Sequence, residues 1–185
     1  MYAKVLENQQ EDLFGDMLIR YAGLDKNDII NGKGFNVSFW TQYCPHRCEG
    51  CHNPETWSKN GGILIEYNQL LQEIIEAIQA NGIIRNFSIL GGEPLCKENI
   101  KLTYNLIKDI KKVYPNILIY CWTGYNFEEI RKKYKEILKN IDILIDGKFI
   151  LEQRDVTLKL RGSSNQRVID IQKSLKENKI IEIKE

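Results

Sequence analysis

The sequence lacks the features of a membrane protein or a general nucleic-acid binder. No apolar run approaches the ~18–20 residues that span a bilayer, and residues 1–10 contain no apolar segment typical of an export signal. The chain has 26 Lys and Arg residues against 25 Asp and Glu, a net charge of +1. This balance argues against a nucleic-acid coat and against a polybasic membrane anchor. We therefore expect a cytoplasmic protein with neither a nucleic-acid nor a membrane partner.

The chain also lacks repeats, low-complexity tracts and any Pro- or Ser-rich linker, and it contains only 4 prolines. Its 185 residues fall within the ~100–200 residues usual for one domain. With 43% hydrophobic and 28% charged residues, the composition is that of an ordinary globular protein with a sizeable core. We predict a single domain over residues 1–185.

Short apolar runs alternate with segments of helical periodicity from about residue 35 onward. The predicted strands are the apolar runs at 35–41, 86–90, 117–122 and 141–145. The predicted helices are the periodic segments at 66–80, 98–113 and 127–138. Weaker patterns predict strands at 17–21 and 180–183. Alternation of this kind is typical of parallel βαβ units and predicts an α/β fold.

Chemically suggestive residues follow each of the four stronger predicted strands. They are residues 44–51, 91–94, 123–125 and 146–148. In parallel α/β folds, functional sites form at the carboxyl ends of the strands, where the loops to the helices begin. We therefore expect these four segments to meet on one rim of the fold.

Three of the five cysteines, Cys44, Cys48 and Cys51, form a C-x3-C-x2-C cluster. In a reducing compartment such a cluster indicates metal binding before disulfides. Soft thiolates suit both iron–sulfur clusters and zinc. A structural zinc ion takes four ligands, and His46 or His52 could be the fourth. Three cysteines alone would leave one iron of a four-iron cluster open to a substrate or cofactor.

The two remaining cysteines have no partner at ligand spacing. Cys121 falls within a predicted strand, so we expect it to be a small core residue. Cys96 follows the rim segment 91–94. A role for Cys96 as a fourth ligand or redox group stays open, although a structural position is the simpler interpretation.

The cysteine cluster followed by Gly91-Gly92-Glu93-Pro94 resembles the radical S-adenosylmethionine enzymes. A larger set of blocks is similar to one family among them, the activating proteins of anaerobic ribonucleoside-triphosphate reductases. These blocks are residues 31–35, 44–48, 51–57, 90–95, 122–125, 145–149 and 161–167. The resemblance covers nearly the whole chain from 30 to 170, and its blocks occur in order.

The resemblance implies the fold, the cofactors and the reaction. The fold would be a partial, incompletely closed parallel βα barrel of the radical S-adenosylmethionine type. Cys44, Cys48 and Cys51 would hold a [4Fe-4S] cluster, and S-adenosylmethionine would chelate the fourth iron. Reductive cleavage would give a 5′-deoxyadenosyl radical that removes a hydrogen from a glycine of the partner reductase. The electron would come from an external low-potential donor such as flavodoxin.

The resemblance also implies which residues contact S-adenosylmethionine. Gly91 and Gly92 would let the backbone approach the methionyl group, because no Cβ intervenes. Glu93 would accept a hydrogen bond from its ammonium group, while Asp146 and Lys148 would contact the ribose hydroxyls and the carboxylate. The alternatives are that the two glycines only form a turn and that Lys148 is only a solvated strand end.

One position departs from the wider superfamily. The residue before the third cysteine, commonly aromatic there, is Gly50, and an aromatic ring follows Cys51 instead, as His52. Stacking on adenine at position 50 is therefore in doubt, although the Gly50 carbonyl could meet the adenine edge. The block 161–167 is open to two interpretations, a surface loop or a contact with cofactor or partner.

Other functions compete with activation of the reductase. The protein could activate another glycyl-radical enzyme, such as pyruvate formate-lyase, or modify a small molecule. From a different class, it could be a zinc-stabilised binding module without catalysis. The colour of anaerobically purified protein separates the zinc alternative, because thiolate-bound iron clusters are brown and zinc proteins are colourless.

Overall fold

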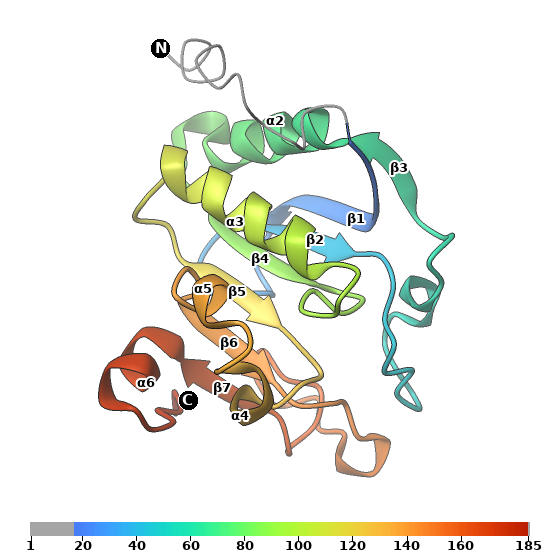
Figure 1. Cartoon of the computed structure of the whole chain (residues 1–185), viewed down its shortest axis with the longest axis vertical. Coiled ribbons are helices and arrows are strands. Elements are labelled where there is room, and N and C mark those ends of the chain that lie inside the picture. The colour runs from blue at the N-terminus through green and yellow to red at the C-terminus, as the bar shows by residue number, and fades with distance from the viewer. Residues whose placement is uncertain (1–16, 185) are drawn as a thin grey trace.

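The computed structural model describes residues 17–184 and confirms an α/β fold (Figure 1). The strands are β1 (Leu18–Asp28), β2 (Asn36–Thr41), β3 (Ile63–Glu66), β4 (Asn86–Gly91), β5 (Ile119–Trp122), β6 (Ile143–Asp146) and β7 (Arg167–Asp170). They form one seven-stranded sheet in the order β3-β1-β2-β4-β5-β6-β7. This sheet positions the loops at the carboxyl ends of its parallel strands, where the functional site was expected.

The middle of the sheet is parallel and its edges are antiparallel. Strands β2, β4, β5 and β6 pair in parallel, as predicted from the alternation of strands and helices. Strands β1, β3 and β7 pair antiparallel, so the sheet is mixed, with the predicted parallel βαβ units in its middle. Strand β1 pairs antiparallel with β2 because residues 29–35 are too few for a parallel crossover, which needs a dozen or more residues.

The weaker expectations at the chain ends are met unequally. The strand expected at 17–21 exists and extends through Asp28 as β1. Residues 180–183 form no strand and contribute only a single bridge between Ile169 and Glu182. Strand β7 was not predicted, because only two apolar residues lie between its charged ends. It begins at Arg167, the last residue of block 161–167.

Five α-helices occur in the described residues. They are α2 (Tyr67–Ile78), α3 (Ile100–Val113), α4 (Phe127–Ile130), α5 (Lys135–Leu138) and α6 (Ile171–Glu177). The first two match the predicted helices, whereas the helix predicted at 127–138 is divided into α4 and α5. Across residues 17–184, none of the helices combines the length and the apolar character needed to cross a bilayer.

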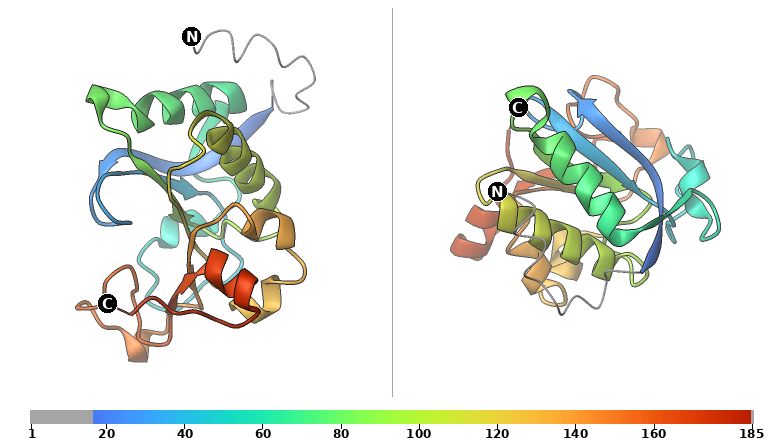
Figure 2. Two further views of the ribbon diagram at one scale, coloured as in Figure 1. Left: turned by 90° about the vertical axis from the view of Figure 1, so that its left-hand side faces the viewer. Right: turned by 90° about the horizontal axis from the view of Figure 1, so that it is seen from above.

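The main core lies between the helices and one face of the sheet. Alternate residues of the parallel strands, such as Phe39, Ile89 and Cys121, are fully buried there with the apolar stripes of α2 and α3. The expected core position of Cys121 is thereby confirmed. In Figure 2 (left), the helices coloured yellow-green to red lie on one side of the sheet, and segment 29–35 lies on the other.

The opposite face of the sheet carries aromatic, polar and apolar side chains, among them Tyr120, Ser88 and Ile145. Segment 29–35 covers part of it, where the Lys33 N–H donates to the Tyr120 hydroxyl at 3.2 Å and the Ser88 hydroxyl donates to the Asn31 carbonyl. Beside Tyr120, the ring of Trp122 stacks at a centroid distance of 6.4 Å. Segment 29–35 therefore covers one part of this face, and the part beyond it extends to the carboxyl ends of the strands.

Candidate active site

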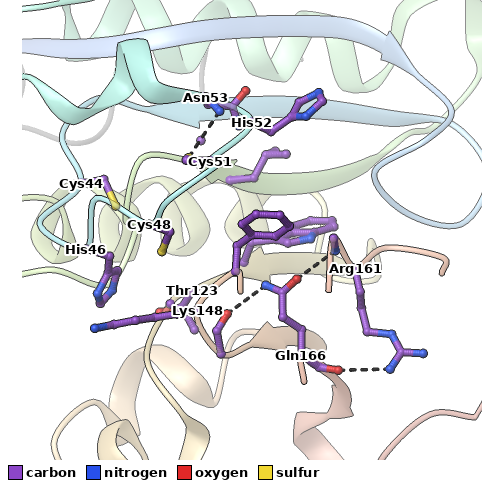
Figure 3. A pocket seen from close by; sticks show the side chains of 18 of the residues that line it. Cys44, His46, Cys48, Cys51, His52, Asn53, Thr123, Lys148, Arg161 and Gln166 are labelled. Atoms are coloured by element: carbon purple, nitrogen blue, oxygen red, sulfur yellow. Dashed lines mark hydrogen bonds between the residues drawn. The ribbon is translucent and has the colours of Figure 1, made fainter. Parts of the chain in front are cut away.

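A cavity of about 810 Å³ lies at the carboxyl ends of the parallel strands. Its lining comes from the loops that follow β2, β4, β5 and β6, so the rim predicted from the sequence exists (Figure 3). The predicted site residues that line the cavity are Cys44, Cys48, Gly50, Cys51, His52, Gly91, Gly92, Glu93 and Lys148. Asp146 is the one predicted site residue that does not line it.

The loop after β2 is shaped by tight turns that place the cysteines. Tyr43, Arg47 and Gly50 have positive φ angles of 78°, 50° and 67°, and the Cys51 N–H donates to the Cys48 carbonyl at 3.1 Å. Such angles are uncommon outside glycine and reverse the chain sharply. The turns bring three separate thiols to one side of the cavity.

The thiols combine burial with backbone hydrogen-bond donors. Burial raises the pKa of the Cys44 thiol to about 11, although the backbone N–H groups of His46 and Arg47 act in the opposite direction. Burial also raises the pKa of Cys48, which the backbone N–H of Phe149 partly offsets. The thiols of Cys44 and Cys48 are therefore protonated near neutral pH before a metal binds, and metal binding would release these protons.

The third thiol has a donor as well. The Asn53 N–H lies 3.4 Å from the Cys51 sulfur (Figure 3). All three sulfurs thus face backbone N–H groups, which stabilise the thiolate form and influence the potential of an iron–sulfur cluster. This donor set fits a thiolate-ligated cluster.

Gly91 and Gly92 are required by contacts within the protein. Gly91 has φ 96°, and a Cβ on it would lie 2.7 Å from the Cβ of Trp40. A Cβ on Gly92 would lie 2.4 Å from the Tyr43 carbonyl oxygen. The Gly92 N–H also donates to the Thr41 carbonyl at 2.8 Å. The two glycines therefore let the loop after β4 pack directly on the cysteine loop.

Glu93 is almost completely buried, with 1% of its surface exposed. Its carboxylate accepts hydrogen bonds from the Leu95 N–H at 2.9 Å, the Thr123 hydroxyl at 2.8 Å and the Gly124 N–H at 2.7 Å. The His46 ring nitrogen Nε2 lies 2.9 Å from the same carboxylate. These donors occupy the acceptor sites of a carboxylate, so an incoming ammonium group would have to share or replace one of them.

Asp146 is fully buried behind the wall of the cavity. The Phe127 N–H donates to its carboxylate at 2.7 Å, and the Arg167 guanidinium donates to both of its oxygens. Side chains alternate along a strand, so Asp146 shares the helix side of β6 with Leu144, while Ile145 faces the opposite side. The structure therefore does not bring Asp146 to the cavity, contrary to the expectation of a direct contact.

Block 161–167 folds over the loop after β6 and lines the cavity. The Gln166 amide donates to the Gly147 carbonyl at 2.9 Å, and the Arg161 guanidinium donates to the Gln166 carbonyl at 3.1 Å (Figure 3). The side chains of Trp122, Arg161 and Gln166 belong to the lining, and the sequence did not identify them individually. The sequence signals were that blocks 122–125 and 161–167 belong to the family resemblance and that block 161–167 is polar.

The comparisons with known proteins identify the family. The 4Fe-4S single cluster domain family matches residues 30–169. Anaerobic ribonucleoside-triphosphate reductase-activating protein of Haemophilus influenzae is 38% identical over 149 residues, which are 80% of this chain and 96% of the relative. The proteins of that name from Enterobacteria phage T4 and Escherichia coli K12 are 38% and 34% identical over 142 residues. Those matches cover 76% of this chain, and 87% and 92% of the two relatives.

The matched range contains the cysteine cluster, the Gly91-Gly92-Glu93-Pro94 segment and block 161–167. The resemblance predicted from the sequence is confirmed, and so is the assignment of the metal group as a 4Fe–4S cluster rather than zinc. The chain belongs to the family of anaerobic ribonucleoside-triphosphate reductase-activating proteins.

Proposed function

We propose that this protein is a radical S-adenosylmethionine enzyme that generates a glycyl radical on an anaerobic ribonucleoside-triphosphate reductase. The observation that carries the proposal is one cavity lined by three cysteine sulfurs, Gly91-Gly92-Glu93 and Lys148 in a member of this family. When bound, the cluster would supply the electron that cleaves S-adenosylmethionine to methionine and a 5′-deoxyadenosyl radical, which takes hydrogen from a glycine Cα.

Cys44, Cys48 and Cys51 would hold the cluster. Three protein ligands leave one iron of a four-iron cluster without a thiolate, and the rest of the cavity beside the sulfurs is where a cofactor would bind. The backbone N–H groups of Phe149 and Asn53 donate to two of the sulfurs, Cys48 and Cys51. Their role would be to fix the thiolates and to favour the reduced cluster.

The opposite side of the cavity would orient S-adenosylmethionine. Lys148 and Arg161 add two cations to the lining, which suit the methionyl carboxylate, since charged hydrogen bonds are stronger than neutral ones. On the side of the cysteines, Glu93 adds a buried carboxylate suited to the ammonium group. Asp146 would act through Arg167 by supporting this side of the cavity, without touching the cofactor.

A protein substrate agrees with the shape of the site. Ile30 and Val156 both line the cavity, and 77% and 80% of their surfaces are exposed to solvent. These two exposed apolar side chains lie beside exposed polar ones such as Arg154, a mixture that suits contact with a polypeptide segment. The fold we propose is a partial βα barrel whose incomplete closure leaves this side of the cavity open. Its expected place of action is the cytoplasm, with a low-potential donor such as flavodoxin.

The test is to incubate reconstituted protein anaerobically with S-adenosylmethionine, a strong reductant and the purified reductase. We expect a glycyl-radical doublet in the electron paramagnetic resonance spectrum and one methionine formed for each radical. A parallel reaction with pyruvate formate-lyase tests the alternative partner. A doublet on that enzyme alone would contradict the proposed partner, and absence of methionine formation from S-adenosylmethionine would contradict the proposed chemistry.

A further inference from the structure

We infer that His46 is a positioning residue that ties the cysteine loop to Glu93 and thereby sets the affinity for S-adenosylmethionine. The inference rests on the proposed function and adds a role for a residue between the first two cysteines. His46 lies between Cys44 and Cys48, and only 7% of its side chain is exposed. Its Nε2 atom lies 2.9 Å from the Glu93 carboxylate.

The imidazole is enclosed by the loops after β2, β4 and β5. The Tyr125 ring meets it edge-on, with ring centroids 4.7 Å apart and an angle of 70° between the planes. A Cβ on Gly124 would lie 2.5 Å from the His46 Cδ2 atom. Any side chain at position 124 would therefore displace the imidazole. The glycine there leaves room for the ring, and His46 lines the cavity (Figure 3).

The donors to Glu93 differ in origin. Leu95 and Gly124 donate through their backbone N–H groups, and Thr123 donates from the loop after β5. His46 is the donor that comes from the cysteine loop. The main chain of Glu93 is already bonded to the cysteine loop at Tyr43. The other donors to its carboxylate, however, come from the loops after β4 and β5, so in the part of the chain that the structure describes only His46 links the carboxylate itself to the loop of the sulfurs. Because the cluster and the Glu93 carboxylate would both contact one S-adenosylmethionine molecule, this tie sets the distance between the two anchors.

The test compares two amide replacements with different reach. In His46→Gln the side-chain amide can occupy the place of Nε2 and donate to Glu93, whereas the shorter amide of His46→Asn cannot. Glu49→Gln is the matched control, because Glu49 is exposed on the same loop and does not line the cavity. All four reconstituted proteins are examined for iron content, for S-adenosylmethionine affinity by calorimetry and for the electron paramagnetic resonance spectrum of the reduced cluster.

We expect equal iron content in all four proteins. His46→Asn should bind S-adenosylmethionine about tenfold more weakly, which corresponds to ~1.4 kcal/mol, and the spectral change on adding it should require correspondingly more ligand. His46→Gln should stay within about threefold of the natural protein, since a side-chain hydrogen bond to a charged group is restored. KM for S-adenosylmethionine should rise more than kcat falls.

Three results would overturn the inference. They are equal affinity in His46→Asn and the natural protein, tighter binding in His46→Asn, and loss of iron from both variants, which would make His46 a support or ligand of the cluster. Failure of the proposed function gives a different result: the natural protein itself, with its cluster intact, would neither bind S-adenosylmethionine nor cleave it.

Discussion

The two walls of the cavity are held together by different kinds of contact. The cysteine wall, residues 41–54 and 90–95, is joined by main-chain hydrogen bonds, such as the Glu93 N–H to the Tyr43 carbonyl at 2.9 Å. The C-terminal wall, residues 147–166, has main-chain hydrogen bonds of its own, such as the Ser164 N–H to the Gln153 carbonyl at 2.9 Å. Its block 161–167, however, is joined to the loop after β6 by side-chain amides, such as the Asn165 amide to the Lys148 carbonyl at 2.8 Å.

The walls meet at Gly50 and Leu151. A Cβ on Gly50 would lie 2.7 Å from the Leu151 Cδ1 atom, and Gly50 has φ 67°. Both the backbone angle and the contact disfavour a larger residue. This explains why an aromatic residue is absent before the third cysteine: Leu151 occupies the space beside the loop.

The largest effect should come from the sulfurs of the cysteine wall. Alanine at Cys44, Cys48 or Cys51 should abolish the cluster and the cleavage of S-adenosylmethionine, because each removes a ligand that the main chain holds in place. Iron and sulfide analysis with the absorption spectrum measures the loss. Cys121→Ala is the control, since Cys121 is buried in the core away from the cavity lining. A variant of the three that keeps its cluster would remove that thiolate from the ligand set.

The next effect concerns the contact within the cysteine wall. Gly92→Ala should lower the free energy of unfolding by ~1–3 kcal/mol and reduce cluster content, because its Cβ would collide with the main chain at Tyr43. Chemical denaturation and iron analysis measure both. Gly23→Ala is the control, since its Cβ would make only an ordinary 3.9 Å contact with Trp40. An unchanged Gly92→Ala protein would mean that the two loops can separate without cost.

Removal of Arg167, which supports the C-terminal wall, should lower the stability of the protein and affect the cluster less than the two changes above. Arg167→Leu leaves the buried carboxylate of Asp146 without its cation, which should cost ~3 kcal/mol of unfolding free energy. S-adenosylmethionine affinity should fall while iron content is retained. Affinity that is unaffected would show that this wall does not depend on Arg167 for its position.

The smallest effect should come from Glu128, which is half exposed and pairs with the outer side of Arg167. Arg167 lowers the pKa of the Glu128 carboxyl from 4.5 to about 2. Because the pKa of Glu128 is lower in the folded protein than in the unfolded chain, its ion pair stabilises the folded state fully above pH 4.5. This stabilisation is lost as the pH falls toward 2.

Glu128→Gln should therefore cost less than ~1 kcal/mol at pH 7, since exposed pairs contribute little. The difference from the natural sequence should shrink toward pH 2. Urea denaturation of cluster-free protein at several pH values measures this. If the difference in free energy of unfolding between the two proteins grew on acidification, the pKa of Glu128 would be raised in the folded protein and not lowered.

The sequence predicted the parallel centre of the sheet, the two long helices and the rim, because periodicity and strand ends are local properties. It placed Cys44 and Glu93 on one rim by the same rule, and the cavity lining agrees. It did not predict that β7 would pair antiparallel with β6. Nor did it predict that β6 would turn Asp146 toward the helices.

What the sequence determined by itself was the order of strands and helices and the chemistry of the cysteine cluster. Only the tertiary structure decided that His46 meets Glu93, that block 161–167 closes the second wall, and that Asp146 is held by Arg167. Those contacts join residues 19 to 47 positions apart. They depend on strand pairing and on which face each side chain takes, and neither is encoded in the local pattern.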